Sequence, residues 1–170
     1  MTEHIPDEFT RSGHLPNTGV LVLDLHRLLT MFLSSKKLAE MRTEEAHDPI
    51  GWLQQYEEDE LHRILLSTAI AARAIDDRDH KFLDKYETNC GQLISDTNHP
   101  EVDQPLNLRE ACNKIIHAKV IHGDLDEVDW KKYSNPILYF YGNYNGKDWK
   151  ATLNVVEYVV KYVETIGMSI

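Results

Sequence analysis

The feature that most constrains the fold is an amphipathic stripe over residues 58–78. Apolar and small residues recur there at the spacing of one helical face, while Glu, Arg and Asp fill the opposite side. The members of the stripe are Leu61, Ile64, Leu65, Thr68, Ala72 and Ile75. This segment is therefore predicted to be a helix that packs in the core.

The same periodicity predicts helices on both sides of this one. A first helix has an apolar face made of Leu21, Leu25, Leu28, Leu29 and Phe32. The stretch KKLAEMRTEEAHDPIGWLQQ predicts two short helices with a break near Asp48-Pro49, because proline disfavours the helical conformation in the residue before it. A last helix is predicted to begin at about Asp148, as N-cap, and to bury Trp149, Leu153, Val156, Val159, Val160 and Val163.

Strands are predicted only between the last two helices. AKVIHG and PILYFYG are rich in β-branched and aromatic residues, and YNGKD contains an Asn-Gly turn signal. DTNHPEVDQPLN, with two prolines, is predicted to be a loop. The fold class is thus expected to be mainly α: a single-domain helical bundle over 18–170 with a small two- or three-stranded antiparallel β element, after an N-terminal arm over 1–17.

Composition narrows the class of protein. A chain of 170 residues that is 42% hydrophobic can bury a core without disulfides or metals, and its two cysteines show no CxxC pairing. The formal charge of -10 disfavours a broad nucleic-acid surface, so any RNA site has to be a local basic pocket. The start of the chain does not resemble a signal peptide and no apolar run is long enough to span a bilayer, so we expect a soluble cytoplasmic protein without cofactor or metal.

Chemistry is suggested by LREACNKIIHAKVIHGD, which begins as an amphipathic helix. Arg109, Asn113 and His117 stand four residues apart on its polar side. They offer a cation for a phosphate, an amide that fixes an orientation, and an imidazole suited to proton transfer near neutral pH. An alternative is purely structural: Arg109 pairs with an acidic neighbour, Asn113 bonds a loop, and His117 closes the last helical turn.

LREACNKIIHA resembles the signature helix of the HEPN superfamily of small helical-bundle proteins. Many members are RNases of toxin–antitoxin and phage-defence systems, and their motif is an Arg, usually followed by Asn, with a His a few residues later. The resemblance implies a homodimer that brings two motifs together, His117 as general acid or base on the ribose 2′-hydroxyl, and an arginine that clamps the phosphate. It therefore implies a metal-independent endoribonuclease.

The chain departs from the family pattern at one position. Cys112 stands directly before Asn113, where the family most often has Arg, and the nearest upstream arginine is Arg109. One hypothesis is that Arg109 supplies the clamp across the dimer. The other is that the chain is a non-catalytic HEPN-like module that binds a partner protein or a nucleotide.

Three lesser candidates remain. Arg73 and His80 have a spacing within the family's range but lack the Asn, and the solvated end of a long acidic helix is the favoured explanation for them. His47-Asp48 suggests an HD-type metal-dependent phosphohydrolase, with His14, His26, Asp76 and Asp103 as further ligands. The run Tyr139, Phe140, Tyr141 and Tyr144 can stack bases, but strand alternation predicts that about half of it is core.

Overall fold

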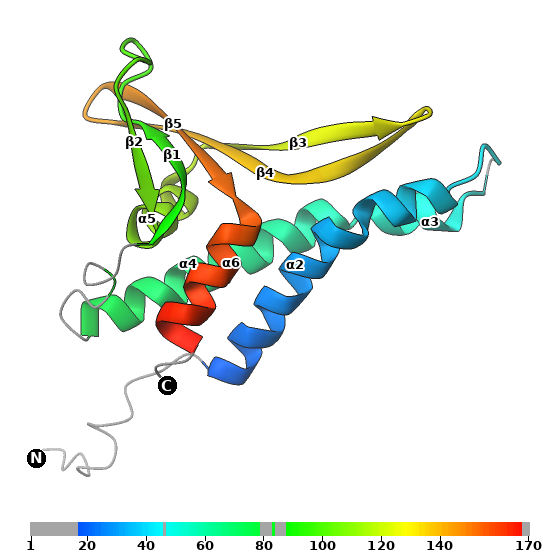
Figure 1. Ribbon diagram of the computed structural model, residues 1–170, viewed down its shortest axis with the longest axis horizontal. Helices are drawn as coiled ribbons and strands as arrows, with labels where there is room; N and C mark the ends of the chain where they lie inside the picture. Colours follow the sequence, from blue (N-terminus) through cyan, green and yellow to red (C-terminus); the bar gives the residue numbers. More distant parts are fainter. Residues whose placement is uncertain (1–16, 46, 79–82, 84–87, 168–170) are drawn as a thin grey trace, which may run out of the picture.

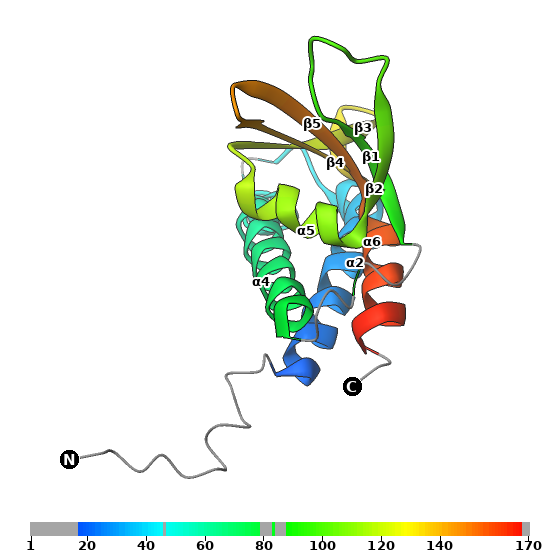
Figure 2. The ribbon, with the colours of Figure 1, turned by 90° about the vertical axis from the view of Figure 1, so that its left-hand side faces the viewer.

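The computed structural model describes residues 17–45, 47–78, 83 and 88–167, and shows a five-stranded antiparallel sheet with helices packed on one face (Figures 1 and 2). The helices are α2 (Thr18–Met41), α3 (Pro49–Gln54), α4 (Glu57–Arg78), α5 (Leu108–His117) and α6 (Val155–Tyr162), which continues into the π-helix η2 (Val163–Gly167). The strands are β1 (Asn89–Ile94), β2 (Asp103–Asn107), β3 (Val120–Val128), β4 (Lys131–Tyr144) and β5 (Lys147–Asn154), in the order β2-β1-β5-β4-β3. The predicted mainly helical bundle with a minor sheet is therefore wrong: the fold is α+β.

The two long helices form as their periodicity predicts. α2 begins after Asn17, whose side chain accepts hydrogen bonds from the amides of Gly19 and Val20, and it buries Leu21, Leu25, Leu28 and Phe32. α4 buries Ile64, Leu65, Thr68, Ala72 and Ile75 of the predicted stripe. The break at Asp48-Pro49 is also confirmed, since Asp48 is the N-cap of α3 and Pro49 is its first residue, but the short helix predicted before the break is the end of α2.

The last predicted helix is the main local error. Residues 147–154 form β5 instead, and α6 begins only after Asn154, whose side chain caps the amides of Val156 and Glu157. Trp149 and Leu153 are buried, but so is Ala151 between them, which is the period-two pattern of a strand. A spacing of four residues fits a helical face and one face of a strand equally well, so these two residues did not distinguish the alternatives.

The sheet is also larger than predicted because two short strands lie in and before the predicted loop. β2 contains Pro105, and proline is tolerated there because β2 is an edge strand of the sheet. β1 passes very close to β5: a Cβ on Gly91 would lie 2.0 Å from the carbonyl oxygen of Thr152. The predicted turn is confirmed, with Asn145 and Gly146 at positive φ between β4 and β5.

The core lies between the sheet and the helices. Alternate strand residues point into it, among them Leu93, Leu106, Leu138, Phe140 and Leu153, and they meet the buried faces of α2, α4, α5 and α6. The long β3–β4 hairpin extends beyond the other strands and over α2 (Figure 1). Within the described ranges, no helix has the length and apolar character that crossing a membrane requires.

Candidate functional site

The predicted polar stripe lies on α5, which is wedged between the sheet and α4 (Figure 2). The Asn107 side chain begins this helix by accepting a hydrogen bond of 2.8 Å from the amide of Glu110. The opposite side of α5 is buried through Leu108, Ala111, Cys112 and Ile115. The division of the helix into an apolar and a polar side, as the sequence predicts, is therefore confirmed.

Arg109 is held by a carboxylate from α4. Its Nε lies 2.8 Å from Oδ2 of Asp76, whose side chain is 0% exposed, and the other carboxylate oxygen accepts a hydrogen bond from the amide of Leu83. This contact is the acidic-neighbour pairing that the sequence left open. Arg109 therefore balances a buried charge where α4 meets α5.

Asn113 is held by a different arginine. Arg73, also on α4, donates through one terminal nitrogen to Oδ1 of Asn113, and Nδ2 of Asn113 donates to Glu110 at 3.0 Å. The other terminal nitrogen of Arg73 lies 3.3 Å from the exposed carboxylate of Asp77. Nε of Arg73 is buried and has no hydrogen-bond partner among the described residues. The fold thus joins a lesser sequence candidate to the main one, while its sequence partner His80 lies outside the described residues.

His117 is the last residue of α5 and is exposed. It follows Asn113 by four residues, so the two side chains lie one helical turn apart on the same side. Two residues later, the amide of Lys119 donates to the carbonyl of Tyr141, directly before the first paired residue of β3. His117 therefore stands at the junction of helix and sheet, accessible to a ligand.

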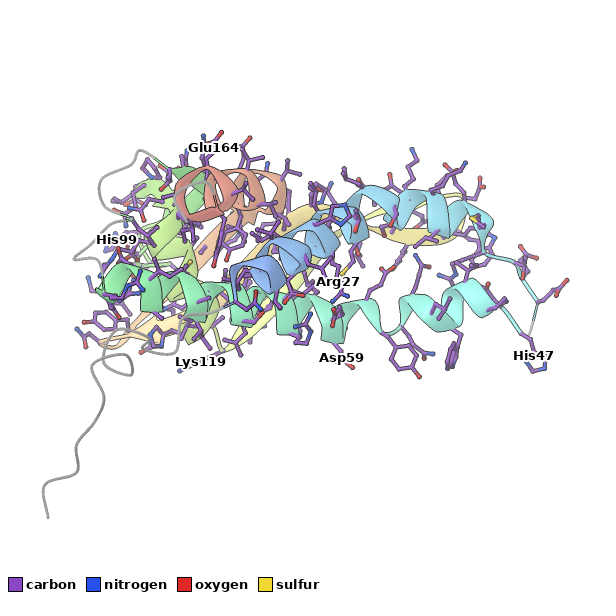
Figure 3. All side chains as sticks on the ribbon, turned by 90° about the horizontal axis from the view of Figure 1, so that it is seen from below. Arg27, His47, Asp59, His99, Lys119 and Glu164 are labelled. Carbon is purple, nitrogen blue, oxygen red and sulfur yellow. The ribbon has the colours of Figure 1, made fainter. Side chains whose placement is uncertain are left out.

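His47 and Asp48 lie apart from the polar side chains of α5, whereas Asp76, predicted as a further ligand for them, pairs with Arg109 instead. Asp48 forms an ion pair of 3.0 Å with Arg42, and His47 lies at one end of the molecule (Figure 3). In the part of the chain that the structure describes, no group of three or more His, Cys, Asp or Glu residues is placed to hold a metal ion. His14 lies outside that part.

The aromatic run divides as strand alternation predicts. Phe140 is buried, whereas Tyr139 and Tyr141 point to the face of the sheet without helices. The Lys150 ammonium lies 4.8 Å and 6.0 Å from the centroids of these two rings. Tyr144, at the end of β4, is 71% exposed.

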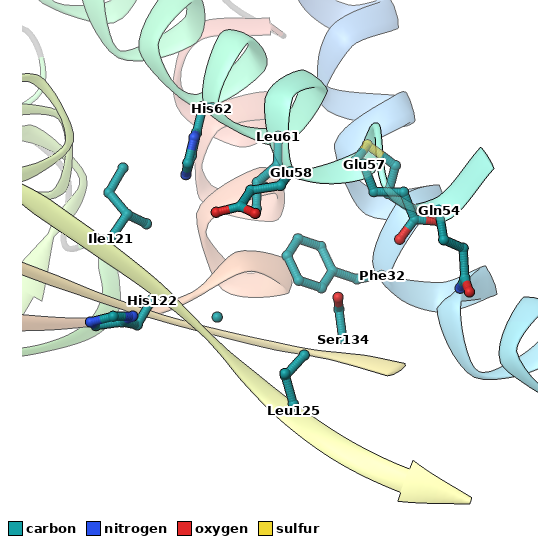
Figure 4. Close-up of a pocket in the computed structure, with 12 residues that line it drawn as sticks. Phe32, Gln54, Glu57, Glu58, Leu61, His62, Ile121, His122, Leu125 and Ser134 are labelled. Carbon is teal, nitrogen blue, oxygen red and sulfur yellow. The ribbon is translucent and has the colours of Figure 1, made fainter. Parts of the chain in front are cut away.

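Sequence reasoning missed a cavity of about 310 Å³ beneath the β3–β4 hairpin. Figure 4 shows side chains from α2, α4 and the hairpin pointing into it. The lining residues are Met31, Phe32, Gln54, Glu57, Glu58, Leu61, His62, Ile121, His122, Gly123, Leu125 and Ser134. They come from three distant parts of the chain, so no local pattern in the sequence indicates them.

The cavity combines apolar walls with two carboxylates. Burial raises the pKa of the Glu57 carboxyl above its ordinary value.

The two cysteines lie in the core, outside this cavity. Burial raises the pKa of both Cys90 and Cys112 to about 12, so neither is a ready nucleophile or metal ligand.

Comparisons of the chain with protein-family models, with curated proteins and with solved structures found no match. The resemblance to HEPN proteins therefore stays a prediction that depends on the residues of α5.

Proposed function

We propose that this chain is a metal-independent endoribonuclease in which His117 transfers protons and Arg73, rather than Arg109, binds the scissile phosphate. The observation that carries the proposal is the hydrogen bond from Arg73 to Asn113, one helical turn before His117. It supplies an arginine beside the asparagine even though Cys112 occupies the position before it.

The chemistry needs a base, an acid and a cation. An imidazole removes the proton of the ribose 2′-hydroxyl, the 2′-oxygen attacks phosphorus, and the 5′-oxygen leaves with a proton from an acid, which gives a 2′,3′-cyclic phosphate. A two-fold dimer with its interface near α5 provides one His117 for each proton transfer. The arginine stabilises the charge on the phosphate oxygens.

The contacts of the two arginines favour different roles. One terminal nitrogen of Arg73 lies 3.3 Å from the carboxylate of Asp77, whose side chain is 66% exposed, and an ion pair with so exposed a carboxylate is weak enough for a phosphate to replace it. Arg109 neutralises the fully buried Asp76, and removing it from that partner leaves an uncompensated charge in the core. Arg73 is therefore the better phosphate ligand.

The test is cleavage of mixed single-stranded RNA by the pure protein in EDTA. We expect the wild type to cleave, and His117→Ala and Arg73→Ala each to lose at least about a hundredfold in rate, the scale of a removed proton-transfer or charge-stabilising group. His99→Ala and Arg27→Ala are matched controls at exposed positions and should retain the wild-type rate. Cleavage that persists in His117→Ala, or wild-type protein without cleavage, would refute the proposal.

Two further measurements complete the design. Because Arg73 connects α4 to α5, each variant is compared by thermal unfolding, so that lost activity is not mistaken for lost structure. Light scattering measures the mass in solution, and a monomer at micromolar concentration contradicts the two-histidine mechanism. A role in toxin–antitoxin or phage-defence systems remains a prediction from the HEPN resemblance.

A second function is favoured by the same network. The polar side chains of α5 are engaged in contacts within the protein: Arg109 pairs with Asp76, and Asn113 bonds Arg73 and Glu110. Such contacts connect α4 to α5 and suit a non-catalytic module that binds a partner protein or a nucleotide. Under this alternative, wild type and His117→Ala are equally inactive on RNA, and both bind the same partner with equal affinity.

A further inference from the structure

The cavity beneath the β3–β4 hairpin has the composition of a small-molecule site. Its volume of about 310 Å³ is at the lower end of the range for ligand pockets. Phe32, Leu61 and Ile121 supply apolar walls from α2, α4 and β3, and Figure 4 shows Phe32 and Ile121 on opposite sides of the space. A site of this size takes a ligand with one ring or a short alkyl chain.

Its charged groups are of one sign. Glu57 and Glu58, on the first turn of α4, are the carboxylates of the lining, and the lining contains neither lysine nor arginine. Among the described residues, neither carboxylate has an ion pair or a hydrogen bond. Figure 4 shows the Glu58 carboxylate directed toward the middle of the cavity.

The Glu57 carboxylate is incompletely solvated without gaining a cation in exchange, while the exposed Glu58 adds a second negative charge beside it. Glu57 is only partly exposed, and burial raises its pKa because nothing nearby compensates its charge. A ligand with a positive charge supplies the missing compensation. His62 and His122, also in the lining, offer nitrogens that can hydrogen-bond an ammonium group or a hydroxyl.

We infer that this cavity binds a small amphipathic amine, whose ammonium group lies against Glu57 and Glu58 and whose apolar group packs on Phe32, Leu61 and Ile121. The inference is separate from the proposed ribonuclease, because it uses none of Arg73, Asn113 or His117. The site is a ligand pocket in addition to the polar cluster on α5.

The experiment titrates ¹⁵N-labelled protein with three probes of similar shape and different charge, at about pH 8: phenethylammonium, 2-phenylethanol and 3-phenylpropionate. We expect phenethylammonium to shift the backbone amides of Gly123 and Ser134, which line the cavity, and to bind at least tenfold more tightly than the alcohol. The carboxylate probe should not bind. Equal affinity of the three probes, or shifts confined to other parts of the chain, would overturn the inference.

Variants assign the charge contact. Glu58→Gln keeps the size of the side chain and should weaken phenethylammonium binding at least tenfold, while Glu44→Gln, at an exposed position outside the cavity, should leave it unchanged. Glu58→Lys places a cation of the chain itself at the cavity and should abolish binding. Unchanged affinity in Glu58→Gln contradicts the inference whatever the outcome of the RNA assay, because chemical shifts do not depend on cleavage.

Discussion

Arg109→Ala should destabilise the protein strongly, because it leaves the carboxylate of Asp76 buried without its cation. Asp76 is 0% exposed, and Nε of Arg109 lies 2.8 Å from its Oδ2. Removing one partner of a buried ion pair costs about 3–5 kcal/mol, and we expect about 3 because the Arg109 side chain is 25% exposed, so that water can enter the space it vacates. With an m value of about 2 kcal/mol per molar urea, the unfolding midpoint should fall by about 1.5 M.

The second substitution of a double-mutant cycle makes the reasoning specific. Asp76→Asn should destabilise the wild type, since it removes the charge that Arg109 neutralises. In the Arg109→Ala background the same substitution should stabilise the protein, because it removes the unpaired charge and retains a side-chain oxygen that can accept the amide of Leu83. The sign of the effect of Asp76→Asn therefore depends on Arg109.

Urea unfolding followed by circular dichroism at pH 7 measures all four proteins. Lys37→Ala is the surface control, since its ion pair with Glu40 is exposed and its loss should leave the unfolding midpoint almost unchanged. A loss below about 1 kcal/mol in Arg109→Ala, or destabilisation by Asp76→Asn in both backgrounds, would refute the structural role of Arg109. In that case Arg109 becomes available again as the phosphate ligand.

Three other outcomes follow from the core and the helix ends. The thiols of Cys90 and Cys112, with pKa values of about 12, should remain protonated and react with Ellman's reagent at pH 8 only after unfolding; rapid reaction in the native state would contradict their burial. Tyr158→Phe should cost about 1 kcal/mol in urea unfolding, because its buried hydroxyl lies 3.0 Å from that of Thr68, and no loss would mean that this hydrogen bond adds nothing. Asn154→Ala should lower the free energy of unfolding by about 1 kcal/mol through loss of the α6 cap, whereas Asn154→Ser should recover most of it.

Elements whose sequence pattern has a single interpretation could be predicted without the tertiary structure. The stripe of α4 and the face of α2 repeat over several turns, so only a helix places all their apolar residues on one side. Asn145-Gly146 marks the β4–β5 turn because few other residue pairs adopt positive φ at both positions. The two sides of α5 were also readable, since its apolar and polar residues separate at the helical period.

Where a sequence pattern fits both a helix and a strand, contacts with other segments determine which of the two forms. Trp149 and Leu153 suit either element, and pairing of β5 with β1 and β4 makes the segment a strand. β2 is short and contains Pro105, so its local sequence resembles a loop, and it is a strand only because β1 lies beside it. The α+β class therefore depends on pairings between segments far apart in the chain, which local propensity does not encode.

The candidate site shows the same division. The sequence selects Arg109, Asn113 and His117 as a polar stripe, but not which groups face them. Asp76 reaches Arg109 and Arg73 reaches Asn113 because α4 packs against α5. The partners in each contact are more than thirty residues apart in the chain, so no local sequence pattern indicates either contact. The cavity is set in the same way, since packing of α2, α4 and the β3–β4 hairpin brings Phe32, Glu58 and Ile121 around one space. The sequence gives the chemical character of each side chain, whereas the packing of the helices against the sheet determines which partner each charged side chain meets.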